Sequence, residues 1–484
     1  MGIGARVWVW VLGAMLALAA GACSCADDSR PRRDGGGVDP IDAGPEPGVD
    51  APVPPGTDGG PPPLPDAPDA RIDRTMFCMG MGPPVIVGDS TMSTATCAGA
   101  IATSVFDNSV CSCDDTNIVG YLRTRSFDSG VPGSSDDDWG APVGVNRNYL
   151  TGGYADIGGS FTIATSSATT FAGYLRIRGD GRFGGDISAI GRVDVYRDLW
   201  ILGSVALTVE ANVTGDLHQP TGRLFGFPTS SVGGSTIRSA FTVERPCACD
   251  PSEIVDIAGI VAAGRAENDN ADIGLMPGVL DPVIGLGVDI ELPCGRFYLS
   301  GISGLGDITL HVNGRTALFV DGDVNALGVF DIDIGPDGEL DMFIGGQLLS
   351  IGAGSYGDRN RPARTRIYAA GGGDVTIIGA TGFVGNVYAP NARITAPGAT
   401  TVYGSLFGRQ IDMPGYLDVH YDRAILDVDV DCPPPTGGCE MCGGIGCSDH
   451  TACILGACTG CTSDADCCAP LVCYPDGTCD SLLI

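Results

Sequence analysis

The sequence predicts an all-β protein that folds as a β-helix, or β-solenoid, in two stretches with one short helix. The chain of 484 residues contains 75 Gly and 50 Asp, but only 8 Glu and no Lys. Lys and Glu are common surface helix formers, whereas Gly and Asp favour turns. Short apolar strands recur at fixed spacing in residues 151–246 and again, less regularly, in residues 247–432. A fixed short period is typical of a solenoid whose stacked coils bury one another, and we expect these coils to be right-handed.

The N-terminus predicts export. Residues 1–22 carry one Arg and an apolar run that ends in small residues, as in a signal peptide. Ala20-Gly21-Ala22-Cys23 resembles the lipobox of bacterial lipoproteins, which implies cleavage before Cys23 and a diacylglycerol on its thiol. Ordinary cleavage after Ala22 and an uncleaved anchor are the alternatives. We therefore expect a protein that is lipid-anchored at the outer membrane or cell surface of a Gram-negative bacterium, or secreted.

Residues 23–75 predict a disordered tether. From Asp27 to Arg74 the chain is mostly Asp, Gly and Pro, with few apolar side chains to bury. Such a segment cannot offset the entropy lost on ordering, and its like charges keep it extended.

The first repeat lies in residues 151–246. Gly173, Gly179, Gly185 and Gly191 recur every six residues, and apolar side chains follow two and four places after each glycine position. This alternation turns two side chains inward on a short strand before a glycine corner. The pattern resembles the bactofilin repeat, which implies a polymer-forming solenoid.

One helix is predicted at the start of the second stretch. Asp250-Pro251-Ser252-Glu253 supplies an N-cap, a proline at the first helical position and a capping-box glutamate. An apolar stripe follows at helical spacing, and the helix is expected to end near Glu267; the stripe comprises Ile254, Ile257, Ala258, Val261 and Ala262. We expect this helix to cover an open end of the solenoid.

A longer repeat runs through residues 247–432. Its aromatic positions, Phe319, Phe343, Tyr368, Tyr388 and Phe407, are 24, 25, 20 and 19 residues apart, which is the length of one full coil. With Asn386-Val387-Tyr388, Tyr403-Gly404-Ser405-Leu406 and His420-Tyr421-Asp422, the segment resembles an uncharacterised domain family of bacterial surface and pilus-assembly-type proteins. The resemblance implies a β-solenoid on an exported protein and no known activity.

Export predicts that the cysteines form disulfides. They fall into even groups, which suggests separately stapled modules in residues 76–150, 247–432 and 433–484. The candidates are Cys78, Cys97, Cys111 and Cys113; Cys247, Cys249, Cys294 and Cys432; and Cys439, Cys442, Cys447, Cys453, Cys458, Cys461, Cys467, Cys468, Cys473 and Cys479. The tail resembles knottin and dickkopf-type modules. A zinc ribbon through Cys439-x2-Cys442 and Cys458-x2-Cys461 is the alternative, and six interleaved cysteines oppose it.

Few residues suggest chemistry. The four histidines, His218, His311, His420 and His450, have no serine elbow or catalytic cysteine beside them, although His420 could pair with Asp422. Two aspartate-rich stretches, 268–272 and 321–325, start like EF-hand loops but lack the required Gly and Glu; Asp136-Asp137-Asp138 is an acidic cluster. Arg178-Gly179-Asp180 matches an integrin tripeptide, but its glycine is explained by the repeat. We predict no catalytic site, no metal and no cofactor, and the net charge of -31 argues against nucleic-acid binding.

Three functions follow. The first is a non-enzymatic, surface-displayed lipoprotein with a structural or adhesive role, whose partners are the membrane and extracellular polysaccharide or surface proteins. The second is a carbohydrate-active β-helix enzyme, for which Asp331, Asp333, Asp337, Glu339 and Asp341 are the only dense carboxylate candidates. The third is a polymer-forming scaffold subunit that stacks through its solenoid ends.

Overall fold

The computed structural model describes residues 98–428, except 137–138, 208, 227–228, 286, 352–353, 378–381 and 397, and four short strands in the tail. All of them lie within the unit Ala70–Ile484. The predicted signal peptide, tether and lipidation residue Cys23 lie outside the described residues. No helix in the described part of the chain is long and apolar enough to span a membrane.

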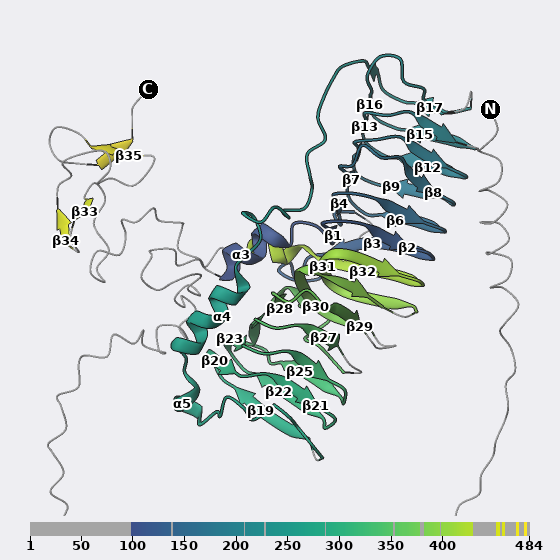
Figure 1. Cartoon of the computed structure of the whole chain (residues 1–484). Coiled ribbons are helices and arrows are strands. Elements are labelled where there is room, and N and C mark those ends of the chain that lie inside the picture. The colour runs from purple at the N-terminus through teal and green to yellow at the C-terminus, as the bar shows by residue number, and fades with distance from the viewer. Residues whose placement is uncertain are drawn as a thin grey trace, which may run out of the picture. The chain divides into compact units, whose positions relative to one another are not determined.

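The described chain is a β-solenoid of about 13 coils, which confirms the predicted fold class (Figure 1). Strands of neighbouring coils pair in parallel throughout. The first half contains β1 Val110–Ser112, β2 Thr116–Ile118, β3 Tyr121–Phe127, β4 Val143–Val145, β5 Tyr149–Thr151, β6 Tyr154–Ile157, β7 Phe161–Ile163, β8 Thr169–Phe171, β9 Leu175–Ile177, β10 Gly181–Phe183, β11 Ile187–Ala189, β12 Arg192–Val195, β13 Leu199–Ile201, β14 Val205–Leu207, β15 Glu210–Val213, β16 Leu217–His218, β17 Ser231–Val232 and β18 Thr236–Ile237.

The second half follows two helices. The helices are α4 Ile257–Ala266 and α5 Asn270–Ile273, and α3 Ala98–Val105 precedes β1. The second half contains β19 Val288–Leu292, β20 Gly295–Leu299, β21 Ile302–Gly304, β22 Ile308–Val312, β23 Arg315–Val320, β24 Val324–Ala326, β25 Phe330–Ile334, β26 Glu339–Ile344, β27 Leu348–Ile351, β28 Thr365–Ala369, β29 Asp374–Ile377, β30 Phe383–Thr395, β31 Thr400–Met413 and β32 Tyr416–Asp422, with 3-10 turns η1 Pro362–Arg364 and η2 Arg423–Asp427. The tail strands are β33 Ala452–Ile454, β34 Ala457–Thr459, β35 Leu471–Cys473 and β36 Cys479–Ser481.

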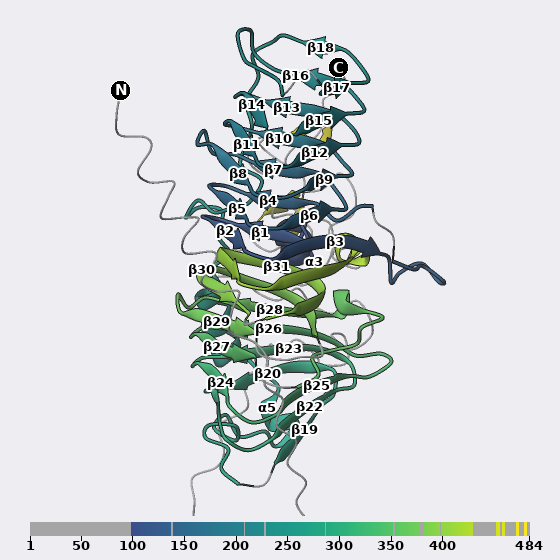
Figure 2. The same ribbon diagram turned by 90° about the vertical axis from the view of Figure 1, so that its right-hand side faces the viewer.

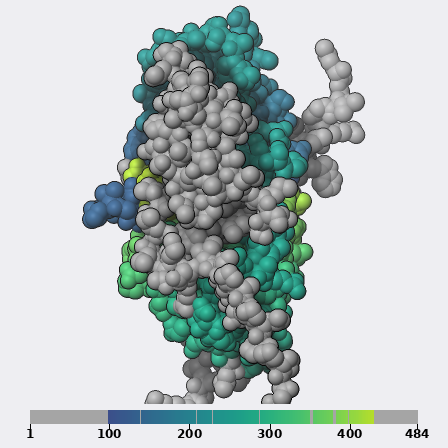
Figure 3. Space-filling model, turned by 90° about the vertical axis from the view of Figure 1, so that its left-hand side faces the viewer, coloured from purple at the N-terminus to yellow at the C-terminus, as the bar shows by residue number. Residues whose placement is uncertain are grey.

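The two halves join in the reverse of their sequence order. The first half starts at the middle of the stack and winds outward to β18, whereas the second half starts at the far end with β19 and winds back to the middle (Figure 2). There β1 and β2 pair with β31, and β3 pairs with β32 over seven residues. We call this junction the seam. The space-filling view shows the coils around β16–β18 at the end of the stack opposite the green coils of the second half (Figure 3).

The six-residue repeat is confirmed, because its apolar positions point into the core of the first half. Leu175 pairs with Val193, so three six-residue units make one coil of 18 residues. The apolar positions of the repeat whose burial is described are buried in the core, among them Leu175, Ile177 and Phe183. Alternating side chains on short strands thus supply the core of each coil.

The glycines of the repeat occupy corners where neighbouring coils nearly touch. A Cβ on Gly173 would lie 2.1 Å from the carbonyl oxygen of Gly153, and one on Gly191 would lie 2.0 Å from that of Gly173. No side chain fits at these distances, so this corner requires glycine on successive coils.

The long repeat is also confirmed, but its aromatic side chains point outward. Phe319, Phe343, Tyr368, Tyr388 and Phe407 pair in register on β23, β26, β28, β30 and β31. The rings of Phe343 and Tyr368 stack with centroids 4.7 Å apart. They form a second apolar core, outside the solenoid wall, with residues of α3 and α4.

The predicted helix exists and ends near Glu267 as expected, and Ile257 and Val261 of its stripe are buried, but its start, its position and the rest of its buried face were wrong. α4 begins after Asp256, whose side chain accepts a hydrogen bond from the Gly259 amide, whereas Asp250 and Glu253 close only a turn. Ala258 and Ala262 are exposed. The buried residues are Ile257, Ile260, Val261 and Gly264, and a Cβ on Gly264 would overlap the ring of Phe319. The helix therefore lies along the flank of β20, β23 and β26 instead of over an open end.

The end of the solenoid is covered by the segment after α4. Asn270 donates to the carbonyl of Tyr298 at 2.7 Å and accepts from its amide at 2.8 Å, so its side chain takes the place of a paired strand on β20. Asp269 accepts from the Arg296 amide at 2.7 Å. Neither α5 nor α3 was predicted, because both are too short to show a clear helical period.

Candidate functional site

One face of the stack across the seam carries many polar and aromatic side chains. It is formed by β32, β3, β6, β9, β12 and β15, which pair in this order. Inward residues of these strands are apolar, so the alternating positions turn a second set outward. We call this surface the ladder face, because equivalent side chains stack from coil to coil.

Tyrosines form the first column of the ladder face. Tyr416, Tyr121, Tyr154 and Tyr174 occupy equivalent places on four successive coils. Ring centroids are 5.1 Å apart between Tyr121 and Tyr154 and again between Tyr154 and Tyr174, and the Tyr154 hydroxyl donates to Asp156 at 3.3 Å. Burial, followed by the neighbouring Asp156 carboxylate, raises the pKa of Tyr154 to about 12. The column is an aromatic row that runs along four successive coils.

The second column alternates in charge. Asp418, Arg123, Asp156, Arg176 and Asp194 follow one another in register along five coils. Opposite charges directly across paired strands stabilise a sheet, so the alternation favours this register.

Each of the buried aspartates of this column has several partners. The Oδ2 atom of Asp156 forms ion pairs with Arg176 Nη1 at 3.4 Å and with Arg178 Nη2 at 3.2 Å. Burial alone would raise the pKa of Asp194, but hydrogen bonds from Arg192, Tyr174 and Asn212 outweigh burial and lower it. Because Arg178 is paired and its side chain is only 13% exposed, the Arg178-Gly179-Asp180 tripeptide is part of the ladder.

A cluster of charged and aromatic side chains around His420 lies on the same face, at the seam. His420 contacts Asp136 at 2.9 Å and Asp418 at 3.6 Å, and its ring stacks on Tyr403. Arg125, from the first half, donates to Asp418 at 2.6 Å. The predicted pairing of His420 with Asp422 was wrong, because Asp422 turns inward to accept from Ser129 and Ala363. The cluster thus links residues that are nearly 300 positions apart.

The acidic stretch 331–341 is divided between two sheets. Asp331 and Asp333 lie on β25 in the sheet of β19 and β22, whereas Glu339 and Asp341 lie on β26. Asp341 binds the buried Arg366 through both carboxylate oxygens, and Glu339 also contacts Arg366. Asp331 accepts the Ser355 amide at 2.5 Å, and Asp333 lies 3.3 Å from His311. Asp337 is exposed in the turn between β25 and β26.

Other corner aspartates bind backbone amides of the next coil. Asp198 accepts from the amide of Asp216 at 2.7 Å, and Asp216 accepts from that of Ser235 at 2.7 Å. Asp323, in one EF-hand-like stretch, accepts from Gln347 in the same way, while Asp269 in the other covers the solenoid end. Among the described residues, no cluster of three or more His, Cys, Asp or Glu side chains could hold a metal ion.

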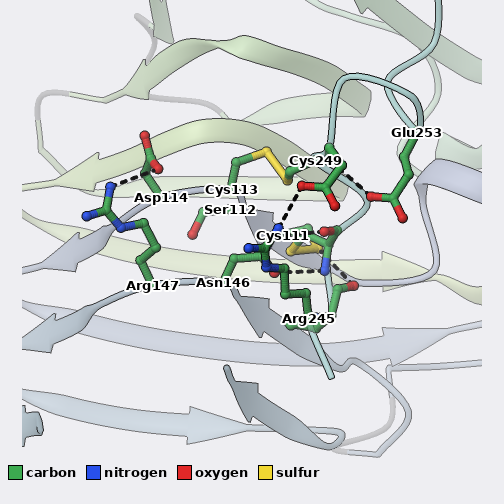
Figure 4. Close-up of a disulfide and its surroundings, with 12 residues drawn as sticks. Cys111, Ser112, Cys113, Asp114, Asn146, Arg147, Arg245, Cys249 and Glu253 are labelled. Carbon is green, nitrogen blue, oxygen red and sulfur yellow. Dashed lines mark hydrogen bonds and ion pairs between the residues drawn. A yellow bond between two sulfur atoms is a disulfide. The ribbon is translucent and has the colours of Figure 1, made fainter. Parts of the chain in front are cut away.

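Two disulfides tie the seam to the strap, which we define as residues 238–256 between β18 and α4. Cys111 bonds to Cys247 and Cys113 to Cys249, with Cα atoms 5.8 and 5.6 Å apart. Figure 4 shows Cys111 on β1 and Cys113 directly after β1, with Cys249 of the strap and Asn146 beside them. The Asn146 side chain donates to the Cys247 carbonyl at 2.8 Å and accepts from its amide at 3.1 Å. The strap is thereby held against β1 and β4.

The predicted grouping of these cysteines was wrong. The even groups suggested bonds within residues 76–150 and within residues 247–432, but both described bonds cross between the groups because the seam brings the groups together. Cys294 is also disulfide-bonded. Cys453 and Cys458 are cross-strand partners on β33 and β34, as are Cys473 and Cys479 on β35 and β36.

The other candidates lie outside the described residues: Cys78, Cys97, Cys432, Cys439, Cys442, Cys447, Cys461, Cys467 and Cys468, as does His450.

Sequence reasoning missed the ladder face. Its signal within the first half is an 18-residue period that relates Arg176 to Asp194. Tyr416, Asp418 and His420 join the same face only through the seam, and no local pattern predicts that pairing.

Comparison with known proteins gives one match. No curated protein and no solved structure matches the chain. Residues 249–428 match the model of a domain of unknown function (DUF7305). The matched residues comprise the end of the strap, α4, α5 and the second half of the solenoid, which is the region expected to resemble an uncharacterised domain. Over these residues, about a third of its length, the chain is similar to DUF7305.

Proposed function

We propose that the protein is a non-enzymatic lipoprotein displayed on the surface of a bacterium, where its solenoid has a structural or adhesive role. The observation that carries the proposal is the ladder face, on which tyrosines and paired charges repeat along successive coils. An extended, regular surface suits attachment to an extended partner, such as an extracellular polysaccharide or a surface protein. Tyrosine and arginine are also the residues that interfaces favour.

The carboxylates favour this role over glycoside hydrolysis. A hydrolase needs one carboxylic acid that can donate a proton and one free carboxylate. Glu339 and Asp341 both converge on the buried Arg366, and Arg315 lies 3.8 Å from Glu339, so neither carboxylate is free. Burial alone would raise the pKa of Glu339, but Arg366 and Arg315 outweigh burial and lower it, so Glu339 is poorly suited to donate a proton.

Two observations support export. Disulfides persist in oxidising compartments outside the cytosol, and Cys111–Cys247 and Cys113–Cys249 hold the strap in place. The signal-like N-terminus and Cys23 then supply the anchor of the proposal.

Intact mass of the membrane-extracted protein tests the anchor. The protein should lack residues 1–22 and carry a lipid on Cys23, and a Cys23→Ser variant should lose both the lipid and membrane retention. An unlipidated protein cleaved after Ala22 and found in the medium would replace the anchor with simple secretion.

Binding to polysaccharide from the producing cell tests the adhesive role. Binding should weaken when Tyr121 and Tyr154 are both replaced by Ser. Matched variants at the exposed Leu224 and Met276, away from the ladder face, should bind as the unmodified protein does. Release of reducing ends from that polysaccharide would contradict the non-enzymatic role.

A further inference from the structure

The positive and negative charges of the ladder face balance on the surface itself. Figure 2 shows five of its strands, β15, β12, β9, β6 and β3, stacked along one side of the solenoid. The outward charged side chains of its six strands are Arg123, Arg125, Arg176 and Arg192, and Asp156, Asp194, Glu210 and Asp418. Arg178 and Asp136 contact this face from the adjoining turns and add one charge of each sign. The whole chain carries a net charge of -31, so the balance is a local property of this face.

The charges are paired along the stack. Arg192 Nε donates to Asp194 Oδ1 at 2.8 Å, and its Nη1 lies 3.0 Å from Glu210 Oε1 on the next coil. At the seam, Arg125 Nη2 lies 2.6 Å from Asp418 Oδ2. A charged partner would have to compete with these ion pairs, and separating one of them leaves a partly buried charge uncompensated, which costs free energy. The face is therefore poorly suited to a charged partner.

The paired groups can still bind hydroxyl groups. A guanidinium group has about five N–H donors and a carboxylate about four acceptor positions, so one ion pair does not use all of either group. Arg192 keeps 48% of its side chain exposed, and Glu210 and Asp418 keep 28% and 27%. Arginine only donates and a carboxylate only accepts, whereas a hydroxyl group does both. A ligand rich in hydroxyl groups can therefore bind along the alternating column without separating an ion pair.

The alternating column continues into uncharged side chains. Beyond Asp194, the next two coils place Asn212 and Ser231 in the same column. Asn212 Nδ2 donates to Asp194 Oδ1 at 3.1 Å, and the Ser231 hydroxyl donates to Asn212 Oδ1 at 2.8 Å. Hydrogen-bonding groups thus extend along the stack without charge, which suits a ligand that presents hydroxyl groups instead of ions.

An exposed aromatic side chain lies at the seam end of the tyrosine column. Tyr416 is 58% exposed, and its ring meets the ring of Tyr121 edge-on, with centroids 6.1 Å apart. Tyr121 and Tyr154, by contrast, stack on one another and are less exposed. Tyr416 therefore offers more of its ring to a ligand than the other tyrosines do, and the C–H face of a sugar packs well against such a ring.

We infer that the ladder face binds an uncharged, extended polysaccharide, which lies along the stack axis and crosses the seam. The inference rests on the adhesive role proposed above and names the class of partner. Equivalent donors and acceptors recur at the spacing of neighbouring strands, about 4.7–4.9 Å, so a ligand of repeating sugar units can make similar contacts on successive coils. Polysaccharides that carry carboxylate or sulfate groups are disfavoured, because the net charge of -31 repels them.

Binding to fractionated polysaccharide tests the inference. Surface polysaccharide of the producing cell is separated by anion exchange into a neutral fraction and an acidic fraction, and both are immobilised for surface plasmon resonance. The full chain, with Cys23→Ser included so that a lipid cannot contribute, should bind the neutral fraction. Its dissociation constant should change less than twofold between about 0.05 M and about 0.5 M salt, because the contact contains no ion pair with the ligand. Tyr416→Ser should weaken this binding at least fivefold.

A charge-reversal variant tests the role of the balance. Glu210→Arg removes an acceptor and adds a positive charge beside Arg192, so it should weaken binding to the neutral fraction at least fivefold and add salt-sensitive binding to the acidic fraction. Asp337→Arg makes the same change in net charge at an exposed turn off the ladder face, and it should bind as the unmodified chain does. The exchange of Arg192→Glu with Glu210→Arg restores the balance and should recover binding to the neutral fraction.

Two sets of results would overturn the inference and leave an adhesive role standing. The first is binding to the acidic fraction alone, or binding to the neutral fraction that falls more than tenfold as salt rises. The second is binding to the neutral fraction that neither Tyr416→Ser nor Glu210→Arg affects, which would place the site elsewhere. Binding to neither fraction would overturn both this inference and attachment to polysaccharide, and would leave a surface protein as the partner in the adhesive role.

Discussion

Arg366 and Asp341 face each other on adjacent coils, with Arg366 Nε 2.6 Å from Asp341 Oδ1 and Nη2 2.7 Å from Oδ2. The Arg366 side chain is only 1% exposed, and its Nη1 donates to the Ala363 carbonyl at 2.8 Å. The carboxylate of Glu339 accepts a further hydrogen bond from Nη2 of the same guanidinium group. The pair belongs to the second core, between the solenoid wall and the segments that cover it, and it connects β26 to β28 and η1.

Removing the arginine should therefore be costly. Arg366→Met leaves Asp341 without its counter-charge and removes the nearer of the arginines beside Glu339, and breaking one side of a buried ion pair costs about 3–5 kcal/mol of unfolding free energy. Adding Asp341→Asn and Glu339→Gln to the same chain should restore part of that loss, because the uncompensated charges are gone. Urea unfolding of the three chains measures both effects, and equal stability of single and triple variants would contradict this account.

The same cluster predicts acid sensitivity. The folded-state pKa of Glu339 lies below its ordinary value of 4.5, because Arg366 and Arg315 outweigh the effect of burial. Its ionisation thus stabilises the fold above pH 4.5, and this contribution is lost as the pH falls toward and through the lowered folded-state pKa. In urea unfolding between pH 6 and 3, Glu339→Gln should show a shallower fall in unfolding free energy than the unmodified protein.

Local patterns predicted the coils but not their order. The six-residue register places Leu175 and Ile177 inside because alternation and glycine corners act within a few residues. The aromatic spacing likewise predicted one coil, although Phe343 and Tyr368 pack outward under the covering segments. Pairing of β3 with β32 depends on residues about 295 positions apart, and nothing near either strand encodes it. The crossing disulfides and the His420 cluster could not be predicted for the same reason.

The glycine corner predicts a strong effect of a single methyl group. Gly173→Ala places a Cβ 2.1 Å from the Gly153 carbonyl oxygen, so one coil must shift. We expect a loss of about 1–3 kcal/mol in unfolding free energy, as for overpacking elsewhere. Gly278→Ala is the matched control, because its Cβ would meet only the Ser300 hydroxyl at 3.8 Å. Equal melting temperatures of the two variants would mean that the coils are not in close contact here.

The segment after α4 that covers the end of the solenoid predicts a local effect on hydrogen exchange. Asn270→Ala removes two hydrogen bonds to the backbone of Tyr298 and leaves the edge of β20 unpaired. The Tyr298 amide should then exchange with deuterium at least tenfold faster, because its partner is gone. Asn391→Ala, at an exposed side chain whose amide donates to the Ala370 carbonyl at 3.1 Å, should leave exchange at Tyr298 unchanged.

The crossing disulfides predict that oxidation secures the seam. Each bond closes a loop of 136 residues, and in the chain-entropy account a loop of that size contributes about 4–5 kcal/mol. Because Cys113–Cys249 closes nearly the same loop, Cys111→Ser with Cys247→Ser should lower the unfolding free energy by only about 1–2 kcal/mol, and the larger loss should appear when both bonds are removed. Removing both bonds should in addition expose the strap to proteases, because its backbone near Cys247 is then held by the side chains of Asn146 and Asn108 without a covalent link. Limited proteolysis with mass mapping measures this, and Ser252→Ala, in an exposed turn of the strap, is the control. An uncut strap in the chain without both bonds would show that packing of α4, rather than the disulfides, holds the two halves together.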